Sequence, residues 1–387
     1  MEIIQSFDFA TSRQIHFGRG SVSRLADYLD NTNGPVLLVT GRHNASDNPV
    51  LTLLRERGVS FLQAVIPGEP DSTLVDQEVD KARTAGVKQV ISFGGGSVMD
   101  GGKAIAMLVT NGGTCLDYAE IVGKGTKITK SSLPHVAIPT TAGTGSEVTR
   151  NAVIIFREKK VKASIRSPLM IPDVAIIDSE TMRTVPPDIT AATGMDALTQ
   201  VIESFLSSRS TILVDSLCEK AIPLAFESLA AAYEDGENQN ARDKMAYVSL
   251  IGGIALANAG LGAVHGFAAA IGGLYDVPHG VVCACFLPVV FETNYSILQK
   301  KKPGHPAIAK YHRIAQYLGS SNGDISKAIE ALYDLRFRLN IPGMRKYGMD
   351  RSMAGDIAEL TSRTSSMKGN PTELTFAQLT EIFIKCV

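Results

Sequence analysis

Cysteine and long apolar runs are both scarce in this 387-residue sequence. Its five cysteines are odd in number and no two of them form a CxxC pair, so neither a disulfide framework nor a structural zinc site is indicated. We find no run of about 18 apolar residues, the length that a membrane-spanning helix needs. The first residues carry acids rather than a basic segment, which argues against a signal peptide. These absences predict a cytoplasmic protein with no membrane partner.

An excess of either charge is missing as well. Lys and Arg number 38 and Asp and Glu number 39, whereas a nucleic-acid-binding protein shows a basic face or stripe. The basic run 300–302 lies beside Pro303 and Gly304 and is typical of a solvated loop. We therefore expect no nucleic-acid partner. Hydrophobic residues make up 44% of the chain, enough at this length to bury the cores of two or three domains.

The chain changes character near its middle. Up to about residue 180, short and continuously apolar runs alternate with amphipathic helical patterns such as 75–85; the runs are 36–40, 89–93, 135–138 and 175–177. Continuous apolar strands are buried on both faces, as in a parallel sheet with helices on each side. Beyond Pro186 and Pro187 the pattern is helical, in 189–207, 212–232, 241–257, 307–318 and 325–339. We predict an α/β domain over 1–187 and an all-helical domain over 188–387.

A glycine-rich turn follows the second apolar run. Gly95, Gly96 and Ser97 stand between a predicted strand and a helix that begins near Val98, with Asp100 in its first turn. Glycines allow close approach of the backbone to a ligand, and a helix N-terminus attracts anions. The turn alone is also compatible with a purely structural role. As a functional site, it predicts a cradle for the pyrophosphate of a dinucleotide.

A second polar loop follows the next predicted strand. It carries four hydroxyl side chains, and their glycine neighbours, at the carboxyl edge of the sheet where open α/β folds bind ligands; these are Thr140, Thr141, Thr144 and Ser146. Two such loops on successive strands strengthen the prediction of a dinucleotide site.

The end of the first predicted strand bears on the choice of dinucleotide. NAD-selective sites usually place an acid near such a strand end, where it binds the ribose 2′-hydroxyl. Here Thr40 is followed by Gly41, Arg42 and Asn44. No carboxylate is present, and the Arg42 guanidinium can pair with a phosphate, unless it is simply a surface residue. The pattern favours NADP over NAD.

Three segments of the helical half carry metal-ligand residues among apolar and small residues. Asp196 and Gln200 are four residues apart and so share one helix face, and His265 and His279 each precede a glycine. A lone histidine is more often structural, but two His-Gly segments and a nearby acid together predict a metal centre. Two imidazoles and a carboxylate suit Zn²⁺ or Fe²⁺ and leave a position for a substrate oxygen.

These motifs, taken together and in this order, resemble those of the iron-containing (group III) alcohol dehydrogenases. The resemblance runs from the segment 17–20 to Asn370 and Pro371 and rests on the strings GGGS (94–97) with Asp100, Lys103 and Ala104, PTTAGTGSE (139–147), GMDALT (194–199), VHG (264–266) and PHG (278–280). It implies the dehydroquinate-synthase-like fold, a nucleotide-binding α/β domain followed by an all-helical one, and a homodimer or higher homo-oligomer. It also implies a cofactor-contacting Lys162, although the neighbouring Lys159 and Lys160 are equally compatible with a solvated hairpin. Met182 is a further candidate for cofactor contact.

Two positions depart from that family. The family usually has a histidine where this chain has Gln200, and often has a second histidine where this chain has Ala269. Gln200 can ligate through its carbonyl oxygen, but more weakly than an imidazole. The related glycerol dehydrogenases bind their metal with one Asp and two His, which implies that Asp196, His265 and His279 can form the metal and catalytic centre, with Gln200 as a fourth candidate ligand. The bound metal is therefore expected to be Fe, Zn or Ni.

The expected reaction is hydride transfer between NAD(P)(H) and a small to medium alcohol or aldehyde. Two other functions remain open at this point. One is a lyase of the dehydroquinate-synthase type, although no cationic cluster for a phosphorylated acidic substrate accompanies the ligands. The other is a catalytically silent dinucleotide-binding homologue, which Gln200 and Ala269 bring into consideration.

Overall fold

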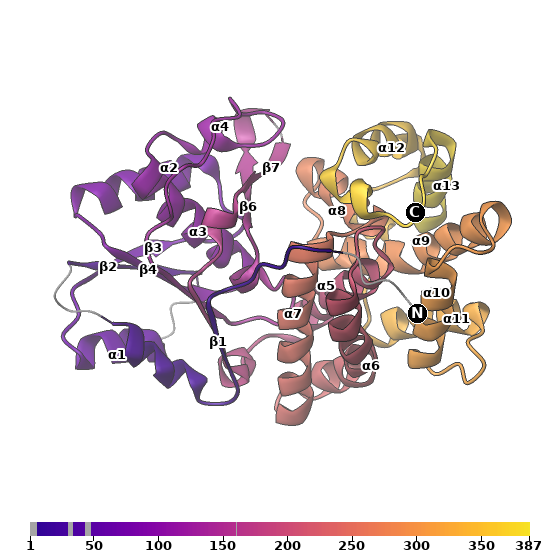
Figure 1. The fold of residues 1–387 in the computed structure, drawn as a ribbon, viewed down its shortest axis with the longest axis horizontal. Helices are drawn as coiled ribbons and strands as arrows, with labels where there is room; N and C mark the ends of the chain where they lie inside the picture. Colours follow the sequence, from indigo (N-terminus) through magenta and orange to yellow (C-terminus); the bar gives the residue numbers. More distant parts are fainter. Residues whose placement is uncertain (1–5, 30–33, 43–47, 160) are drawn as a thin grey trace. The chain divides into compact units, whose positions relative to one another are not determined.

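The computed structural model describes residues 6–29, 34–42, 48–159 and 161–387. Their contacts divide the chain into two compact units (Figure 1). The sheet unit comprises Ala10–Thr141 and Gly145–Thr184. The helical unit comprises Val185–Val387 together with Ala142–Thr144 and the N-terminal segment up to Phe9.

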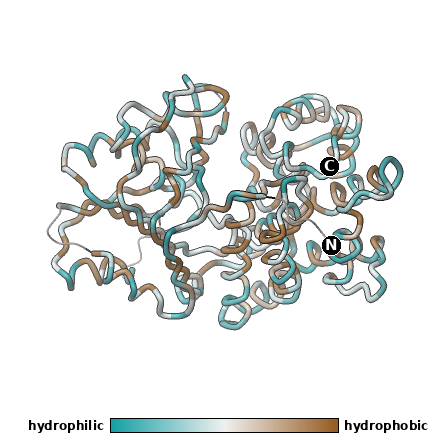
Figure 2. The backbone as a smooth tube through the Cα atoms, in the orientation of Figure 1, coloured by the Kyte–Doolittle hydropathy of each residue, from teal (hydrophilic) through white to brown (hydrophobic). Residues whose placement is uncertain are grey.

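The sheet unit is built on a parallel sheet with the strand order β1-β8-β5-β4-β2-β3. The bounds of these strands are β1 Gln14–Phe17, β2 Val36–Thr40, β3 Phe61–Val65, β4 Gln89–Gly94, β5 His135–Pro139 and β8 Val174–Ile177. A separate antiparallel hairpin pairs β6 (Asn151–Phe156) with β7 (Val161–Arg166). The predicted parallel sheet is thus confirmed. Figure 2 shows the hydrophobic colour running along the strands.

Both faces of the sheet are covered, because alternate side chains of each strand point to opposite faces. Leu37 and Val39 of β2 pack with the core beneath α2 (Ser72–Thr84) and α3 (Gly96–Asn111), while Val36 and Leu38 pack with the core beneath α1 (Pro49–Glu56). The short α4 (Cys115–Tyr118) adds Cys115 to the first of these cores. Burial on both faces is the physical reason that the strand sequences lack polar alternation.

The helical unit contains no strand among its described residues. Its helices are α5 Pro187–Leu206, α6 Ile212–Glu234, α7 Gln239–Ala259, α8 Ala263–Leu274, α9 His279–Lys301, α10 Ala307–Tyr317, α11 Ile325–Arg338, α12 Ala354–Ser362 and α13 Phe376–Cys386. Helices α5, α6 and α7 pack against one another, and α9 packs against both α5 and α8. Together with the sheet unit, this confirms the predicted fold class.

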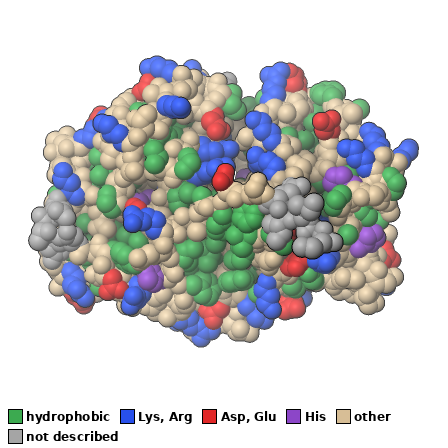
Figure 3. Space-filling view, in the orientation of Figure 1, with side chains coloured by type: hydrophobic (Ala, Val, Ile, Leu, Met, Phe, Trp, Pro, Cys, Tyr) green, Lys and Arg blue, Asp and Glu red, His purple; other side chains and the backbone are tan. Residues whose placement is uncertain are grey.

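Helix α9 departs from one expectation. By length and composition alone it is apolar enough to cross a membrane, as is the pair α7 and α8 if its 97° bend is ignored. However, 72% of its most apolar stretch is buried inside the structure, as in a helix of a protein core. Charged side chains of both signs are scattered over the face shown in Figure 3.

A buried histidine in the sheet unit makes stability depend on pH. Burial, and then the charge of Lys103, lower the pKa of His135 from 6.5 to about 3, and Ser92 Oγ lies 2.8 Å from its Nε2. Below pH 6.5 the unfolded chain protonates this imidazole and the native one does not. The free energy of unfolding should therefore fall by about 2 kcal/mol between pH 6.5 and pH 5 through this group alone.

We expect His135→Gln to remove this contribution while keeping a polar partner for Ser92. Because the chain lacks tryptophan, urea unfolding is best followed by circular dichroism, at both pH values and for both proteins. The expected result is a smaller loss of stability on acidification in the variant. Equal losses in the two proteins would contradict the assignment.

Candidate functional site

The first part of the site lies on α5. Pro187 occupies the first turn of this helix, where its missing N–H costs little, and the next turns bury Asp196 and Gln200. Gln200 Nε2 donates to Asp196 Oδ1 at 3.3 Å, as expected for residues one turn apart. Asp196 is therefore held by a hydrogen bond within α5 itself.

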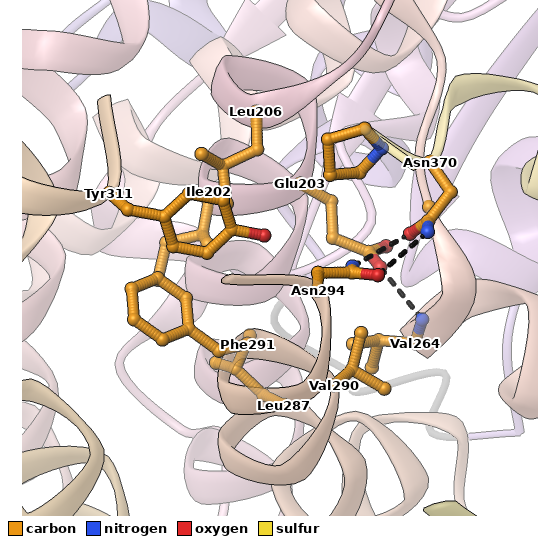
Figure 4. A pocket seen from close by; sticks show the side chains of 12 residues that line it. Ile202, Glu203, Leu206, Val264, Leu287, Val290, Phe291, Asn294, Tyr311 and Asn370 are labelled. Atoms are coloured by element: carbon orange, nitrogen blue, oxygen red, sulfur yellow. Dashed lines mark hydrogen bonds between the residues drawn. The ribbon is translucent and has the colours of Figure 1, made fainter. Parts of the chain in front are cut away.

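His265 lies in the first turn of α8 and is oriented by Glu203 of α5. The Glu203 carboxylate accepts from Val264 N at 2.7 Å, from His265 N at 3.3 Å and lies 2.7 Å from His265 Nδ1; Figure 4 shows the Glu203–Val264 bond. This leaves His265 Nε2 facing Asp196 Oδ1 at 3.1 Å. A carboxylate on the outer ring nitrogen is the usual partner of a metal-ligating histidine.

Glu203 is a functional residue that the sequence motifs did not single out. The signal was present, because 196, 200 and 203 are spaced to share one face of a helix. A glutamate is rarely so well buried without a partner, and Glu203 is 6% exposed. Behind it a cavity of about 10 Å³ is lined in part by Tyr311 and Asn294 (Figure 4). That cavity holds at most one water molecule and is not a substrate site.

His279 and Cys283 come from the first two turns of α9. His279 Nε2 lies 3.7 Å from Asp196 Oδ1, and Cys283 Sγ lies 3.8 Å from the same oxygen. One donor atom each from Asp196, His265, His279 and Cys283 lies within 4.8 Å of the others, and we call these residues the four-donor group. Sequence reasoning found three of its members and missed Cys283.

The electrostatics of the four-donor group favour a cation. Burial by itself raises the pKa of Asp196, but the charges and hydrogen bonds of His279 and His265 outweigh it and hold that pKa below its usual value. Burial likewise opposes protonation of His265, yet hydrogen bonds to Asp196 and Glu203 raise its pKa to about 9. Burial and the nearby acids raise the pKa of Cys283. The buried carboxylates of Asp196 and Glu203 thus stabilise positive charge at the four-donor group, either as protonated histidine or as a metal ion.

The glycine-rich turn in the sheet unit has the geometry of an anion cradle. Gly95 caps α3 and Gly96 is its first residue, so the helix N-terminus opens directly from β4. Thr140 N donates to Gly94 O at 2.9 Å, which holds the second polar loop against the first. A Cβ on Gly95 would lie 3.4 Å from Thr141 Oγ1. The structure therefore brings the candidates Gly95, Gly96 and Thr141 together, with Ser97 in the same helix turn.

Asp100 and Ser146 form hydrogen bonds that connect the glycine-rich turn and the second polar loop. Ser146 Oγ donates to Asp100 Oδ1, while Asp100 Oδ2 accepts from Val153 N at 2.9 Å. Lys103, which is fully buried, donates to Ser146 O at 2.9 Å and to Thr149 Oγ1 at 2.8 Å. These bonds tie α3 to the second loop, so Asp100 and Ser146 shape the site from within.

The remaining cofactor candidates are more dispersed. A Cβ on Gly41 would lie 3.7 Å from Val98 Cγ2, so Gly41 adjoins the first turn of α3, whereas Arg42 is exposed and Asn44 falls outside the described residues. Lys162 of β7 forms an ion pair with Glu69. Two further candidates are Met182, which is buried, and Thr144, whose segment belongs to the helical unit.

Comparisons with known proteins agree with this architecture. Residues 12–179 match the family model "Iron-containing alcohol dehydrogenase", and residues 190–387 match the model "Fe-containing alcohol dehydrogenase family, C-terminal". Alcohol dehydrogenase 4 of Saccharomyces cerevisiae (strain ATCC 204508 / S288c) is 37% identical over 376 residues, 95% of each chain. The 1,3-propanediol dehydrogenase of Citrobacter freundii is 34% identical and covers 97% of this chain and 98% of its own length.

Solved structures agree as well. A 1,3-propanediol oxidoreductase superposes with a TM-score of 0.89 at 33% identity, covering 99% of this chain and 100% of its own. Sulfoacetaldehyde reductase from Bifidobacterium kashiwanohense, solved in complex with NAD⁺, gives a TM-score of 0.87 at 29% identity and covers 99% of both chains.

Fold, loops and relatives together define an NAD(P)-dependent oxidoreductase of the alcohol dehydrogenase type. The chain belongs to the iron-containing alcohol dehydrogenase family. The resemblance found in the sequence motifs is thereby confirmed.

Proposed function

We propose that the protein reduces aldehydes, or oxidises the corresponding alcohols, at a divalent metal ion held by Asp196, His265 and His279. The observation that carries this proposal is the convergence of these donors within 4.8 Å, with Glu203 orienting His265. The donor set fits a divalent cation, because it offers one carboxylate and two imidazoles. Such an ion, when bound, supplies Lewis-acid activation of the substrate oxygen.

The protein residues supply position and charge. Asp196 gives the site its negative charge, Glu203 fixes the ring of His265, and His279, 42% exposed, stands where solvent reaches the group. Gly95, Gly96 and Ser97 are proposed to bind the pyrophosphate of the dinucleotide at the N-terminus of α3. A nicotinamide dinucleotide held there would supply the hydride chemistry of the reaction.

The finer assignments belong to the same proposal. We propose the domain boundary at 187/188, which lies one residue after the start of α5 at Pro187 and within three residues of the division between the two compact units at Thr184 and Val185. We propose a cytoplasmic homodimer or higher homo-oligomer. For the substrate we propose a small to medium alcohol or aldehyde, which accords with relatives named 1,3-propanediol dehydrogenase. For the metal ion we propose Fe, Zn or Ni.

Metal analysis combined with a cofactor assay tests this function. The purified protein is expected to carry about one divalent ion per chain and, when loaded, to oxidise NADPH or NADH with short and medium aliphatic aldehydes. Absence of turnover with either cofactor, across the panel and with the site loaded, would overturn the enzymatic function and leave a silent dinucleotide-binding homologue.

Gly41 is proposed to favour NADP, since an acid at this strand end would bind the ribose 2′-hydroxyl of NAD and repel a 2′-phosphate. We expect Gly41→Asp to shift the ratio of kcat/KM values for NADPH and NADH towards NADH by about 10–100-fold, because a hydrogen bond to a charged group contributes about 1.5–3 kcal/mol. The nearest contact of the new Cβ, Val98 Cγ2 at 3.7 Å, is an ordinary one, so the fold should accept the change.

The matched control is Gly304→Asp in an exposed loop of the helical unit, where a Cβ meets nothing within 4 Å. It should leave the cofactor ratio unchanged. An unchanged ratio in Gly41→Asp as well would contradict the placement of the ribose at this strand end.

A further inference from the structure

We propose that Cys283 is a fourth protein ligand of the metal, occupying the coordination position that Gln200 leaves unfilled, and that the site is accordingly a zinc site. The proposal deepens the proposed function and rests on its metal centre. It assigns a role to a cysteine that the spacing of Asp196, His265 and His279 gave no reason to select.

The position of the thiol is the first support. Cys283 follows His279 by one helical turn of α9, so both side chains leave the same face of that helix. Its Sγ lies 3.8 Å from Asp196 Oδ1 and within 4.8 Å of the donor atoms of both histidines. A tetrahedral site with metal–ligand distances of about 2.0–2.3 Å has edges of about 3.3–3.8 Å. The separations from Asp196 Oδ1 to His279 Nε2, 3.7 Å, and to Cys283 Sγ, 3.8 Å, match those edges. The separation to His265 Nε2, 3.1 Å, is shorter because a hydrogen bond joins these two atoms.

The orientation of Gln200 is the second support. Its Nε2 donates to Asp196 Oδ1, so the amide nitrogen, which cannot ligate a metal, is the atom turned towards the group. Its Oε1 is buried without a hydrogen-bond partner in the described part of the chain and faces α7, where a Cβ on Gly252 would lie 2.9 Å away. Gln200 therefore orients Asp196 and leaves a coordination position for another residue.

The chemistry of sulfur selects the metal. A four-coordinate set of one thiolate, two imidazoles and one carboxylate is the coordination that zinc prefers, whereas carboxylate and water ligands suit harder divalent ions better. Binding breaks the S–H bond of Cys283 and forms a metal–sulfur bond, and the proton passes to bulk water with no change of oxidation state. The donor set becomes one carboxylate, two imidazoles and one thiolate. Because His279 is 42% exposed and Asp196 and His265 are 4% and 6% exposed, the side beside His279 remains accessible for a substrate oxygen as a fifth ligand.

Cys285 provides a matched control on the same helix. It is also buried, but its Sγ donates to Pro342 O at 3.5 Å, away from the four-donor group. Cys285→Ser therefore removes a sulfur atom from α9, as Cys283→Ser does, but leaves the four-donor group unchanged.

Cobalt substitution tests the proposal without depending on activity. The full-length protein is stripped of metal, loaded with Co²⁺ and examined by absorption spectroscopy, with metal content measured in parallel. We expect a thiolate-to-cobalt charge-transfer band in the near ultraviolet, which Cys283→Ser abolishes and which Cys285→Ser and Gln200→Ala retain. Chelator competition should show Zn²⁺ affinity in Cys283→Ser reduced by about 10–100-fold or more, since even residues that only orient ligands change affinity by that much.

The outcomes separate the proposals. A protein that binds about one Co²⁺ without the band, or a Cys283→Ser variant that keeps the band, would overturn the role of Cys283 and leave the metal centre of Asp196, His265 and His279 standing. A protein that binds neither Co²⁺ nor Zn²⁺ would overturn both. Circular dichroism of each variant establishes that a lost band does not reflect unfolding.

Discussion

Replacing Asp196 by Asn should reduce kcat/KM by about 10³-fold or more and lower the metal content of the purified protein. Asp196 Oδ1 is the shared neighbour of the other three donors, at 3.1 Å from His265 Nε2, 3.7 Å from His279 Nε2 and 3.8 Å from Cys283 Sγ. The amide keeps the shape of the side chain and removes its charge. Metal-ion stabilisation of developing charge is worth several kcal/mol, and each 1.36 kcal/mol is a factor of about ten in rate.

The control for this substitution lies on the same helix. Asp188 occupies the exposed first turn of α5, and Asp188→Asn should leave metal content and kcat/KM close to those of the unaltered protein. Its expected cost is limited to about 0.3–1 kcal/mol of stability from the lost interaction with the helix dipole. Metal content by elemental analysis and steady-state kinetics are measured for both variants. Full metal occupancy and activity in Asp196→Asn would show that Asp196 is not a ligand.

Gly280→Ala should lower activity by about 100-fold although it removes no functional group. A Cβ at Gly280 would lie 1.8 Å from the backbone oxygen of Ala192, one turn before Asp196 on α5. The first turn of α9 must then move away from α5 and carry His279 with it. A shift of about 1 Å at a reacting centre can cost about 10²-fold in rate, and overpacking of this kind costs about 1–3 kcal/mol of stability.

Two measurements distinguish displacement of His279 from general loss of fold. Thermal unfolding of Gly280→Ala should show a cooperative transition at reduced temperature, while zinc affinity measured on the folded protein falls. Gly355→Ala, on α12 at a position where a Cβ meets nothing within 4 Å, should leave both quantities within the range of a surface substitution, about ±0.5 kcal/mol in stability. Normal zinc affinity and turnover in Gly280→Ala would contradict the close packing of α9 on α5.

The sequence was most informative where burial is complete. Strands β2, β5 and β8 are buried at every position, and each contains a continuous apolar run that marks it as an interior strand of a parallel sheet. The half-exposed strands β1 and β3 lie at the two edges of the same sheet and carry no such run. Helices such as α8 are rich in glycine and alanine and apolar on most sides, so helical periodicity is weak in them. Such edges and buried helices require the tertiary partners to be known.

By itself, the sequence determined which residue types could form the site. Asp196, His265 and His279 stand in short motifs with glycine neighbours, and the phosphate-binding turn at Gly95 is a local strand-to-helix connection that needs no distant partner. The tertiary structure alone decided how those ligands are held. Glu203 reaches His265 across 62 positions, and Cys283 reaches Asp196 across 87, because α5, α8 and α9 pack together. Neither helical spacing nor residue type reports such an approach between distant segments. Because these approaches depend on helix packing, only the tertiary structure identified the buried Cys283 as a candidate metal ligand. It likewise showed that Gln200 hydrogen-bonds to Asp196 and orients it.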